Sequence, residues 1–263
     1  MKMKKAIIIG ATSGIGKSLA ELLLREGFEV GVTGRREELF QSIKIQETSR
    51  IVFKKMDVQD LSTLEAICNE LVSQMGGLDL LIISAGIGEE NKNLNFDVEH
   101  SVIKTNIQGF TCIADWAVRY FKEQGYGHLV NISSIAGIRG NGIAPSYNAT
   151  KAYQINYLEG LRINVKEYGS SITITDVRPG FVDTAMAKGE GLFWVAPVQK
   201  AAEQIFEAIK QKLSSVMLKV YKPGVKLLIS SDVHAKWINS LTLWSSGVAD
   251  TFSFKKYSTA LTS

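Results

Sequence analysis

The sequence contains few of the residues on which disulfide-rich and metal-centred proteins depend. Among its 263 residues there are two cysteines and three histidines. Cys68 and Cys112 stand far apart, and neither belongs to a CxxC pair. This scarcity argues against a disulfide scaffold and a zinc site, and it indicates a reducing compartment. We therefore expect a cytoplasmic protein that holds no metal.

Long hydrophobic runs are also missing from the start of the chain. The basic stretch Met1–Lys5 precedes only four apolar residues before Gly10, too few for the apolar region of a signal peptide or for a membrane span. The net charge of +4 comes from lysines and arginines scattered along the chain, which does not predict nucleic-acid binding. We expect a small-molecule substrate, no nucleic-acid partner and no membrane span.

What the sequence does have is a regular alternation of apolar runs and helical patterns. Apolar runs rich in β-branched residues predict strands, and apolar residues at helical spacing predict helices. Strands separated by helices pair in parallel through right-handed crossovers. The pattern predicts an α/β fold, a Rossmann-type doubly wound parallel sheet in three layers (α/β/α). The expected strands cover residues 6–9, 28–33, 51–55, 78–83, 128–132, 172–177 and 215–221, and the expected helices cover 17–26, 61–75, 98–124 and 146–168.

The pattern is consistent with a single domain, because no internal repeat and no linker rich in Pro, Gly or Ser divides its main part. We expect residues 1–221 to form a dinucleotide-binding catalytic domain with a substrate lid at about 185–196. In that lid, Phe193 and Trp194 either line an apolar pocket or dock on the core. The extension 222–263 is open to three interpretations: an amphipathic anchor, a cap over the pocket or a disordered end.

A glycine-rich turn follows the first expected strand and opens the first expected helix. Free backbone N–H groups and the positive end of the helix dipole meet there, which suits a pyrophosphate. Glycines let the ligand and the helix approach the backbone closely. The alternative is a tight turn with no ligand. The residues assigned to cofactor binding in this turn are Gly10, Thr12, Ser13, Gly14, Ile15 and Gly16.

The end of the second expected strand carries two arginines where dinucleotide folds usually place an acid. An acid holds the ribose 2′-hydroxyl of NAD, whereas a base holds the 2′-phosphate of NADP. Arg35 and Arg36 follow Gly34, and guanidinium groups clamp phosphates bidentately. We therefore favour NADP(H) as the cofactor, with NAD(H) as the alternative. A solvated basic turn beside Glu37 and Glu38 is the interpretation without a ligand.

A tyrosine and a lysine stand four residues apart at the start of the helical stretch 146–168. This spacing places Tyr147 and Lys151 on one face of a helix. A neighbouring cation favours the phenolate of a tyrosine, so the pair is suited to moving a proton near neutral pH. The same spacing also occurs on ordinary surface helices, and by itself it does not identify a catalytic site.

Taken in order along the chain, these motifs resemble those of the short-chain dehydrogenases/reductases. The resemblance runs from Lys5 to about Lys212, and its specific part is the succession of motifs at strand ends and helix starts. It implies an NADP(H)-dependent oxidoreductase that interconverts a carbonyl and an alcohol by hydride transfer. The motifs are GATSGIG at 10–16, Met56-Asp57-Val58, Ser84-Ala85-Gly86, Asn106, Asn131-Ile132-Ser133-Ser134, Tyr147-Asn148-Ala149-Thr150-Lys151 and Arg178-Pro179-Gly180-Phe181-Val182-Asp183-Thr184.

The resemblance implies a catalytic role for four residues. Ser134 stands thirteen residues before Tyr147, the family's usual interval, so it is chosen over Ser133 as the hydroxyl that binds the substrate oxygen. Ser133 would then be structural. Tyr147 would donate its proton to that oxygen, while Lys151 would hold the nicotinamide ribose and lower the pKa of the phenol. Asn106 would hold a water that links Lys151 to solvent.

The remaining motif residues are implied to line the cofactor. Asp57 would meet the adenine amine, and the stretch after the sixth strand would seat the carboxamide through the Val182 backbone and the Thr184 hydroxyl. The chain departs from the family at Ser84, where an asparagine that braces the central strands is usual, and we expect altered stability more than lost catalysis. The implied cofactor residues are Asp57, Val58, Ser84, Ala85, Gly86, Tyr147, Lys151, Pro179, Gly180, Val182 and Thr184.

Other functions and the state of assembly remain open at this point. A non-catalytic dinucleotide sensor would use the same fold to regulate a partner. A nucleotide-sugar epimerase shares Tyr-x-x-x-Lys but generally needs a longer C-terminal domain, and a hydrolase would need a Gly-x-Ser-x-Gly elbow that this sequence lacks. The resemblance implies a homodimer or homotetramer whose interface contains the aromatic residues of 98–124 and 146–168. Burial of those aromatics within one chain is the alternative.

Overall fold

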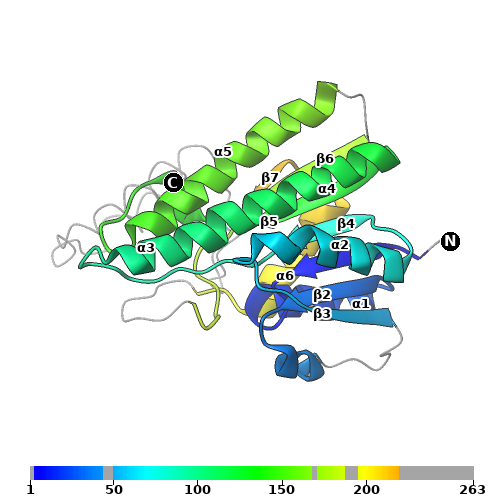
Figure 1. Cartoon of the computed structure of the whole chain (residues 1–263), viewed down its shortest axis with the longest axis horizontal. Helices are drawn as coiled ribbons and strands as arrows, with labels where there is room; N and C mark the ends of the chain where they lie inside the picture. The colour runs from blue at the N-terminus through cyan, green and yellow to red at the C-terminus, as the bar shows by residue number, and fades with distance from the viewer. Residues whose placement is uncertain (1–2, 44–49, 168–170, 187–194, 219–263) are drawn as a thin grey trace, which may run out of the picture.

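The computed structural model describes residues 3–43, 50–167, 171–186 and 195–218, which form a seven-stranded sheet with helices on both faces (Figure 1). The strand order is β3-β2-β1-β4-β5-β6-β7, and all neighbouring strands are parallel. The predicted doubly wound sheet is therefore confirmed. The strands are β1 (Lys5–Ile9), β2 (Glu29–Gly34), β3 (Ile51–Lys55), β4 (Leu80–Ile83), β5 (Tyr126–Ile132), β6 (Ser171–Arg178) and β7 (Ser215–Met217).

Six α-helices of the described chain cover the sheet (Figure 1). They are α1 (Gly14–Arg25), α2 (Leu61–Met75), α3 (Phe96–Ile103), α4 (Phe110–Gln124), α5 (Pro145–Glu167) and α6 (Val198–Lys210). Successive residues of a strand point to opposite faces. Ile8 of β1 therefore joins the hydrophobic cluster under α1 and α6, while Ile7 and Ile9 join the cluster under α2, α4 and α5. Both faces are buried, which explains why the central strands are apolar throughout.

The structure differs from the single helix expected over 98–124. A π-helical segment, η3 (Lys104–Gly109), separates α3 from α4. It contains Asn106, whose buried side chain accepts a hydrogen bond from the Ile87 N–H at 2.9 Å and donates one to the Ile87 carbonyl at 2.8 Å. Such segments are frequent at functional sites. The apolar spacing alone does not reveal this one, because it changes the backbone over less than two turns.

The expected elements also omitted α6. Its buried face follows helical spacing closely, so a signal was present in the sequence. The buried residues are Ala201, Ala202, Ile205, Phe206, Ala208 and Ile209. These side chains complete the hydrophobic cluster that α1 shares, and the two helices pack side by side on that face of the sheet.

The aromatic residues of α4 and α5 pack largely within the chain. Trp116 and Phe121 are buried, and the Trp116 ring stacks on Tyr120. Tyr153 and Tyr157 are partly buried and stack on one another. The core interpretation therefore describes Trp116 and Phe121, while the homodimer or homotetramer stays a prediction.

Two sequence predictions fall mainly outside the described residues. The extension 222–263 lies outside them entirely, and so do Phe193 and Trp194 of the expected lid. Within the residues that the structure describes, none of the helices has the length and apolarity needed to cross a membrane. The same residues contain no group of three or more histidine, cysteine, aspartate or glutamate side chains arranged to hold a metal ion.

His128 is a buried histidine in the centre of the sheet. Its Nε2–H donates to the Thr175 hydroxyl of β6 at 2.8 Å, because that hydroxyl itself donates to the Leu213 carbonyl. Burial, with a smaller contribution from Lys212, lowers the pKa of His128 from 6.5 to about 4. The folded chain therefore holds this imidazole in its neutral form down to moderately acidic pH.

We expect the protein to lose stability through His128 as the pH falls from 6.5 to about 4. In that window the unfolded chain binds a proton that the folded chain excludes, so the free energy of unfolding decreases by up to about 3 kcal/mol. Denaturant unfolding at about pH 7 and about pH 4 measures this loss. Between these two pH values, the free energy of unfolding of His128→Asn should decrease less than that of the wild type, and the difference should be about that amount. His100→Asn, which changes an exposed histidine, should follow the wild type. Equal losses in His128→Asn and the wild type would contradict the assignment.

Candidate active site

The carboxyl ends of the strands open into a cleft of about 560 Å³. In doubly wound sheets, ligands bind where the strand order reverses, which here is between β1 and β4. The volume lies within the range of small-molecule and cofactor sites. All site residues predicted from the sequence line this cleft except Gly16 and Asn106. The lining members are Gly10, Thr12, Ser13, Gly14, Ile15, Arg35, Arg36, Asp57, Val58, Ser84, Ala85, Gly86, Ser134, Tyr147, Lys151, Pro179, Gly180, Val182 and Thr184.

Close backbone contacts shape the glycine-rich turn at one end of the cleft. Gly10 has a φ of +87°, and a Cβ added there would lie 2.6 Å from the Ala85 nitrogen. A Cβ added at Gly16 would lie 2.1 Å from the Gly10 carbonyl oxygen. The absence of both side chains lets α1 begin directly beneath the turn, so its N-terminal N–H groups face the cleft. This cradle fits the pyrophosphate of a dinucleotide.

The two arginines lie at the same end of the cleft. Arg36 Nη2 lies 3.3 Å from the Thr12 hydroxyl and 3.1 Å from the Ser13 hydroxyl, so its guanidinium crosses the edge of the turn. Arg35 lines the cleft next to it, and both side chains are exposed. The turn and the end of β2 therefore present hydroxyls and positive charge together.

The sequence motifs of β5 and α5 meet at the centre of the cleft. Ser134 ends the β5 motif and is buried, and Tyr147 lies in the first turn of α5. Ser134 and Tyr147 both line the cleft, and the Ser134 hydroxyl acts on the phenol so as to lower its pKa. One turn further along α5, the buried Lys151 places its ammonium 5.8 Å from the centre of the Tyr147 ring. The structure thus brings together three of the four residues assigned to catalysis.

Burial sets the protonation of this cluster. It raises the pKa of Tyr147, and the effect of the Ser134 hydroxyl offsets part of that rise. The loss of solvation dominates in the protein alone, and the lowering of this pKa by Lys151 stays a prediction. Burial lowers the pKa of Lys151 from 10.5 to about 8, against an opposing effect of Asp176. At neutral pH the tyrosine is a neutral phenol, the form that donates a proton.

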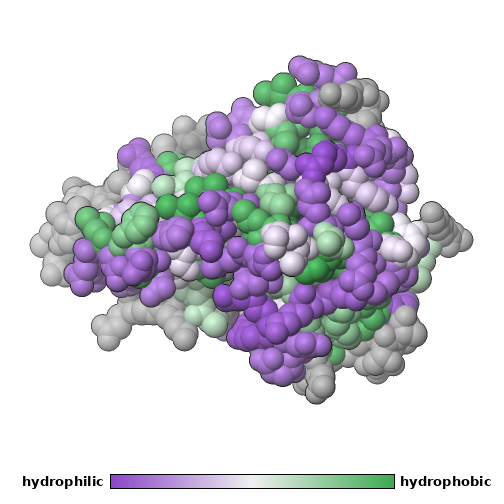
Figure 2. Space-filling view, in the orientation of Figure 1, coloured by the Kyte–Doolittle hydropathy of each residue, from purple (hydrophilic) through white to green (hydrophobic). Residues whose placement is uncertain are grey.

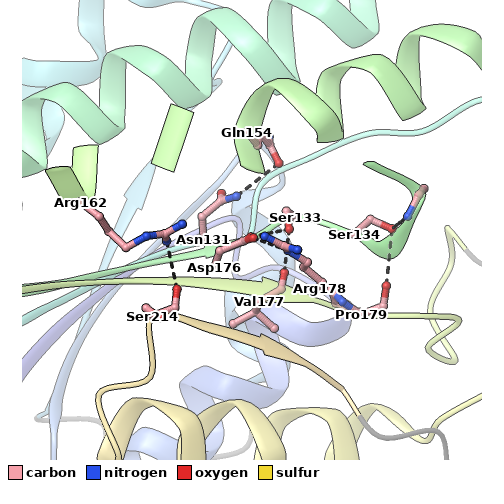
Figure 3. A network of polar contacts seen from close by, with 11 residues as sticks. Asn131, Ser133, Ser134, Gln154, Arg162, Asp176, Val177, Arg178, Pro179 and Ser214 are labelled. Atoms are coloured by element: carbon pink, nitrogen blue, oxygen red, sulfur yellow. Dashed lines mark hydrogen bonds and ion pairs between the residues drawn. The ribbon is translucent and has the colours of Figure 1, made fainter. Parts of the chain in front are cut away.

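Ser133 and Ser134 are neighbours with different partners (Figure 3). The Ser133 hydroxyl donates to Asp176 Oδ1 at 2.5 Å, and the other carboxylate oxygen of Asp176 accepts from Arg178 Nε at 2.6 Å. This ion pair joins two residues of β6, and its carboxylate is fully buried. The Ser134 Oγ accepts from the Ala136 N–H at 3.1 Å and so begins a short 3-10 helix. The Ser134 hydroxyl also donates to the Pro179 carbonyl at 3.5 Å, and the choice of Ser134 over Ser133 as the reactive hydroxyl stays a prediction.

Several residues to which no site role was assigned fix Tyr147. Glu99 of α3 accepts a hydrogen bond from the Ser146 N–H at 3.0 Å, and the Ser146 hydroxyl lowers the pKa of this carboxyl. Asn148 donates to the Ala136 carbonyl at 2.8 Å. A Cβ added at Gly88 would lie 2.8 Å from the Tyr147 ring. These contacts hold the first turn of α5. Asn148 lies within the Tyr147–Lys151 motif and Gly88 follows Ser84-Ala85-Gly86 by two residues, whereas Glu99 belongs to no motif.

Asn106 lies behind the cleft and not in its lining. Besides its two bonds to Ile87, its amide donates to the Thr150 hydroxyl at 3.1 Å. Asn106 therefore ties η3 to α5 and to the segment after β4. Its assigned role, holding a water for Lys151, stays a prediction.

The segment after β6 closes the cofactor end of the cleft. Thr184 lies over the glycine-rich turn, with its Cγ2 3.2 Å from where a Cβ of Gly14 would stand. Val182 is buried and forms an isolated bridge with Ala196. On the opposite wall, Asp57 is exposed, and its carboxylate accepts from the Gln59 N–H at 3.0 Å. These positions are compatible with the cofactor contacts assigned to them, which remain predictions.

Comparison with known proteins identifies the family. Residues 4–192 match the family model described as short chain dehydrogenase. An uncharacterized oxidoreductase of Myxococcus xanthus is 32% identical over 192 residues, 71% of this chain and 75% of that protein. An uncharacterized oxidoreductase of Staphylococcus aureus is 34% identical over 188 residues, 70% of this chain and 80% of that protein. The chain belongs to the short-chain dehydrogenase/reductase family of oxidoreductases.

Solved structures of other proteins share the fold. ElxO with NADP bound superposes with a TM-score of 0.75 at 24% identity, over 82% of this chain and 97% of that chain. A variant of actinorhodin polyketide ketoreductase with NADPH gives a TM-score of 0.73 at 24% identity, over 83% of this chain and 96% of that chain. A short chain dehydrogenase from Burkholderia cenocepacia in complex with NADP gives 0.73 at 21% identity, over 95% and 94%.

Proposed function

We propose that this chain interconverts a carbonyl and an alcohol with NADP(H), using Tyr147 as the general acid and base. The observation that carries the proposal is that Ser134, Tyr147 and Lys151 line the same cleft as the dinucleotide turn. Membership of an oxidoreductase family supports it. The complete cluster argues against a sensor without catalytic activity, which would have no need of a buried lysine beside a reactive phenol.

Different residues of the cleft have different roles in the reduction. The nicotinamide, when bound, supplies the hydride that reaches the carbonyl carbon. Ser134 holds the carbonyl oxygen by a hydrogen bond, and Tyr147 delivers its proton to that oxygen as negative charge develops there. Lys151 holds the ribose and stabilises the phenolate that remains. In alcohol oxidation, Tyr147 instead receives the proton.

The lining of the cleft indicates the kind of substrate. Most lining residues close in sequence to Ser134, Tyr147 and the segment after β6 are apolar. They include Ile135, Ile138, Ile143, Phe181 and Met186. We propose a ketone or aldehyde with an apolar body, because burial of its hydrocarbon surface against these side chains would stabilise the complex.

A substrate screen tests the reaction. NADPH consumption is followed with aliphatic and aromatic ketones and aldehydes of increasing size. Turnover that increases with the apolar surface of the substrate would support the proposal. Saturable NADPH binding without turnover of any carbonyl, or oxidation of any alcohol with NADP, would favour the sensor instead.

We expect Arg36→Ala to weaken NADPH binding by roughly tenfold or more and to leave NADH binding nearly unchanged. A hydrogen bond to a charged group contributes about 1.5–3 kcal/mol, and only NADPH carries the 2′-phosphate. Quenching of tryptophan fluorescence measures both affinities, and Arg35→Ala is measured in parallel. Arg25→Ala removes an exposed arginine at the end of α1 and serves as the control. Wild-type preference for NADH would overturn the assignment of NADP(H).

A further inference from the structure

Gln154 is a fully buried amide one turn beyond Lys151 on α5. Figure 3 shows its side chain extending from the helix toward Asn131 of β5. A buried amide is costly unless its oxygen and nitrogen both find partners. No motif includes Gln154, and the proposed mechanism assigns it no role.

The amide of Gln154 joins three parts of the site. Its Oε1 accepts from Lys151 Nζ at 3.1 Å and from Asn131 Nδ2 at 3.3 Å. Its Nε2 donates to the backbone carbonyl of Asn106 in η3 at 2.8 Å. The partners fix the orientation of the amide, because the reverse orientation would set its NH₂ against two donors. The side chain therefore spans the space between Lys151 and the Asn106 carbonyl.

The ammonium of Lys151 has three N–H donors, and the protein accounts for two of them. One donates to the Ile132 carbonyl at 3.0 Å and one to Gln154. Lys151 also lines the cleft, which leaves the third donor for a ligand there. Both acceptors are neutral, and within the residues that the structure describes no hydrogen bond joins this ammonium to a carboxylate.

We propose that Gln154 is a positioning residue for Lys151, whose neutral amide holds the ammonium from behind so that its remaining donor points into the cleft. The amide also joins Lys151 to the backbone carbonyl of Asn106. Because it is neutral, it directs the ammonium without forming an ion pair, and so the positive charge stays available to Tyr147 and to a bound ribose. The catalytic part of this inference rests on the proposed function, whereas the contact with Lys151 does not.

Titration of Lys151 in the full-length protein tests the proposal without a substrate or a cofactor. Lysine side chains are labelled with ¹³C, and the Lys151 signal is assigned by its loss in Lys151→Arg. We expect Gln154→Glu to raise the titration midpoint of Lys151 by roughly 1–3 pH units, because a carboxylate would then face the ammonium. Gln108→Glu makes the same chemical change on the exposed side of η3, and we expect it to leave the midpoint nearly unchanged, because solvent screens that charge.

A second variant keeps the test decisive if Gln154→Glu does not fold. Gln154→Met has a similar volume but no acceptor, so we expect a lower midpoint for Lys151, since the ammonium loses a hydrogen bond. A role limited to packing predicts that Gln154→Met leaves the midpoint of Lys151 unchanged, and that result would overturn the proposal.

Turnover separates this proposal from the proposed function. With a carbonyl substrate found, the pH dependence of alcohol oxidation should move upward in Gln154→Glu, because the carboxylate offsets the charge that stabilises the Tyr147 phenolate. A shifted Lys151 titration in a protein that turns over no substrate would retain the positioning role and reject the reaction. Normal turnover with an unchanged Lys151 titration would retain the reaction and reject the positioning role.

Discussion

Replacing Tyr147 by phenylalanine should reduce turnover by roughly 10²–10⁴-fold while NADPH still binds, because the substitution removes only the proton that the substrate oxygen receives. The ring keeps its contacts with Gly88 and its place on α5, so the shape of the cleft is retained. Initial rates of NADPH consumption with the carbonyl found in the screen give the turnover. Fluorescence titration of the same preparation gives the cofactor affinity.

Tyr153→Phe is the matched control for this experiment. Its hydroxyl lies 3.0 Å from the Thr111 hydroxyl, on the same helix as Tyr147 but among the side chains shared by α4 and α5. It should keep nearly full turnover, because its hydroxyl does not line the cleft. If Tyr147→Phe retained the activity of the wild type, another group would have to supply the proton.

Gly16→Ala should abolish most of the cofactor binding and destabilise the fold. The new methyl would stand 2.1 Å from the Gly10 carbonyl oxygen, which is backbone and has no side chain to turn aside. Overpacking of this kind costs about 1–3 kcal/mol of stability. Because the turn must move away from α1 to make room, we expect NADPH affinity to fall by at least roughly tenfold, equivalent to about 1.4 kcal/mol.

The control for this substitution is another glycine within a helix. Gly160 of α5 has no atom within 4 Å of where a Cβ would stand. Gly160→Ala should therefore stabilise the protein by roughly 0.5–1 kcal/mol, because alanine loses less backbone freedom in a helix. Cofactor titrations and denaturant unfolding of both variants form the comparison. Wild-type affinity in Gly16→Ala would show that the close packing of the turn is not needed for binding.

The sequence was sufficient to predict the sheet and the position of most of the site. The strands follow from apolar runs, and the parallel pairing follows from the helices between them, so the end of the sheet at which Gly10, Ser134 and Tyr147 meet was predictable. The motifs are local stretches of chain whose backbone geometry depends on nearby residues, especially glycines. Local signals of this kind can be recognised in a single sequence.

The partners of buried polar groups were not predictable in the same way. Gln154 reads as one polar position in a helix whose apolar pattern is weak, yet it is fully buried among Lys151, Asn131 and Asn106. These residues come from separate elements, and their contacts exist only after the sheet and α5 have packed. The protonation of Tyr147 had the same difficulty, because spacing shows the nearby cation but not the loss of solvent that outweighs it.

The η3 segment also affects how the helices on either side of it are aligned around their axes. An α-helix advances by about 100° per residue, since 3.6 residues make one turn. The π-helical stretch between α3 and α4 changes this rotation. The apolar stripe of α3 and the apolar stripe of α4 are therefore offset from one another around the helix axis. Each stripe can then face the protein interior. Asn106 lies between the two stripes, and its side chain bonds to Ile87. A polar residue can therefore lie behind the cleft without being placed on a hydrophobic stripe.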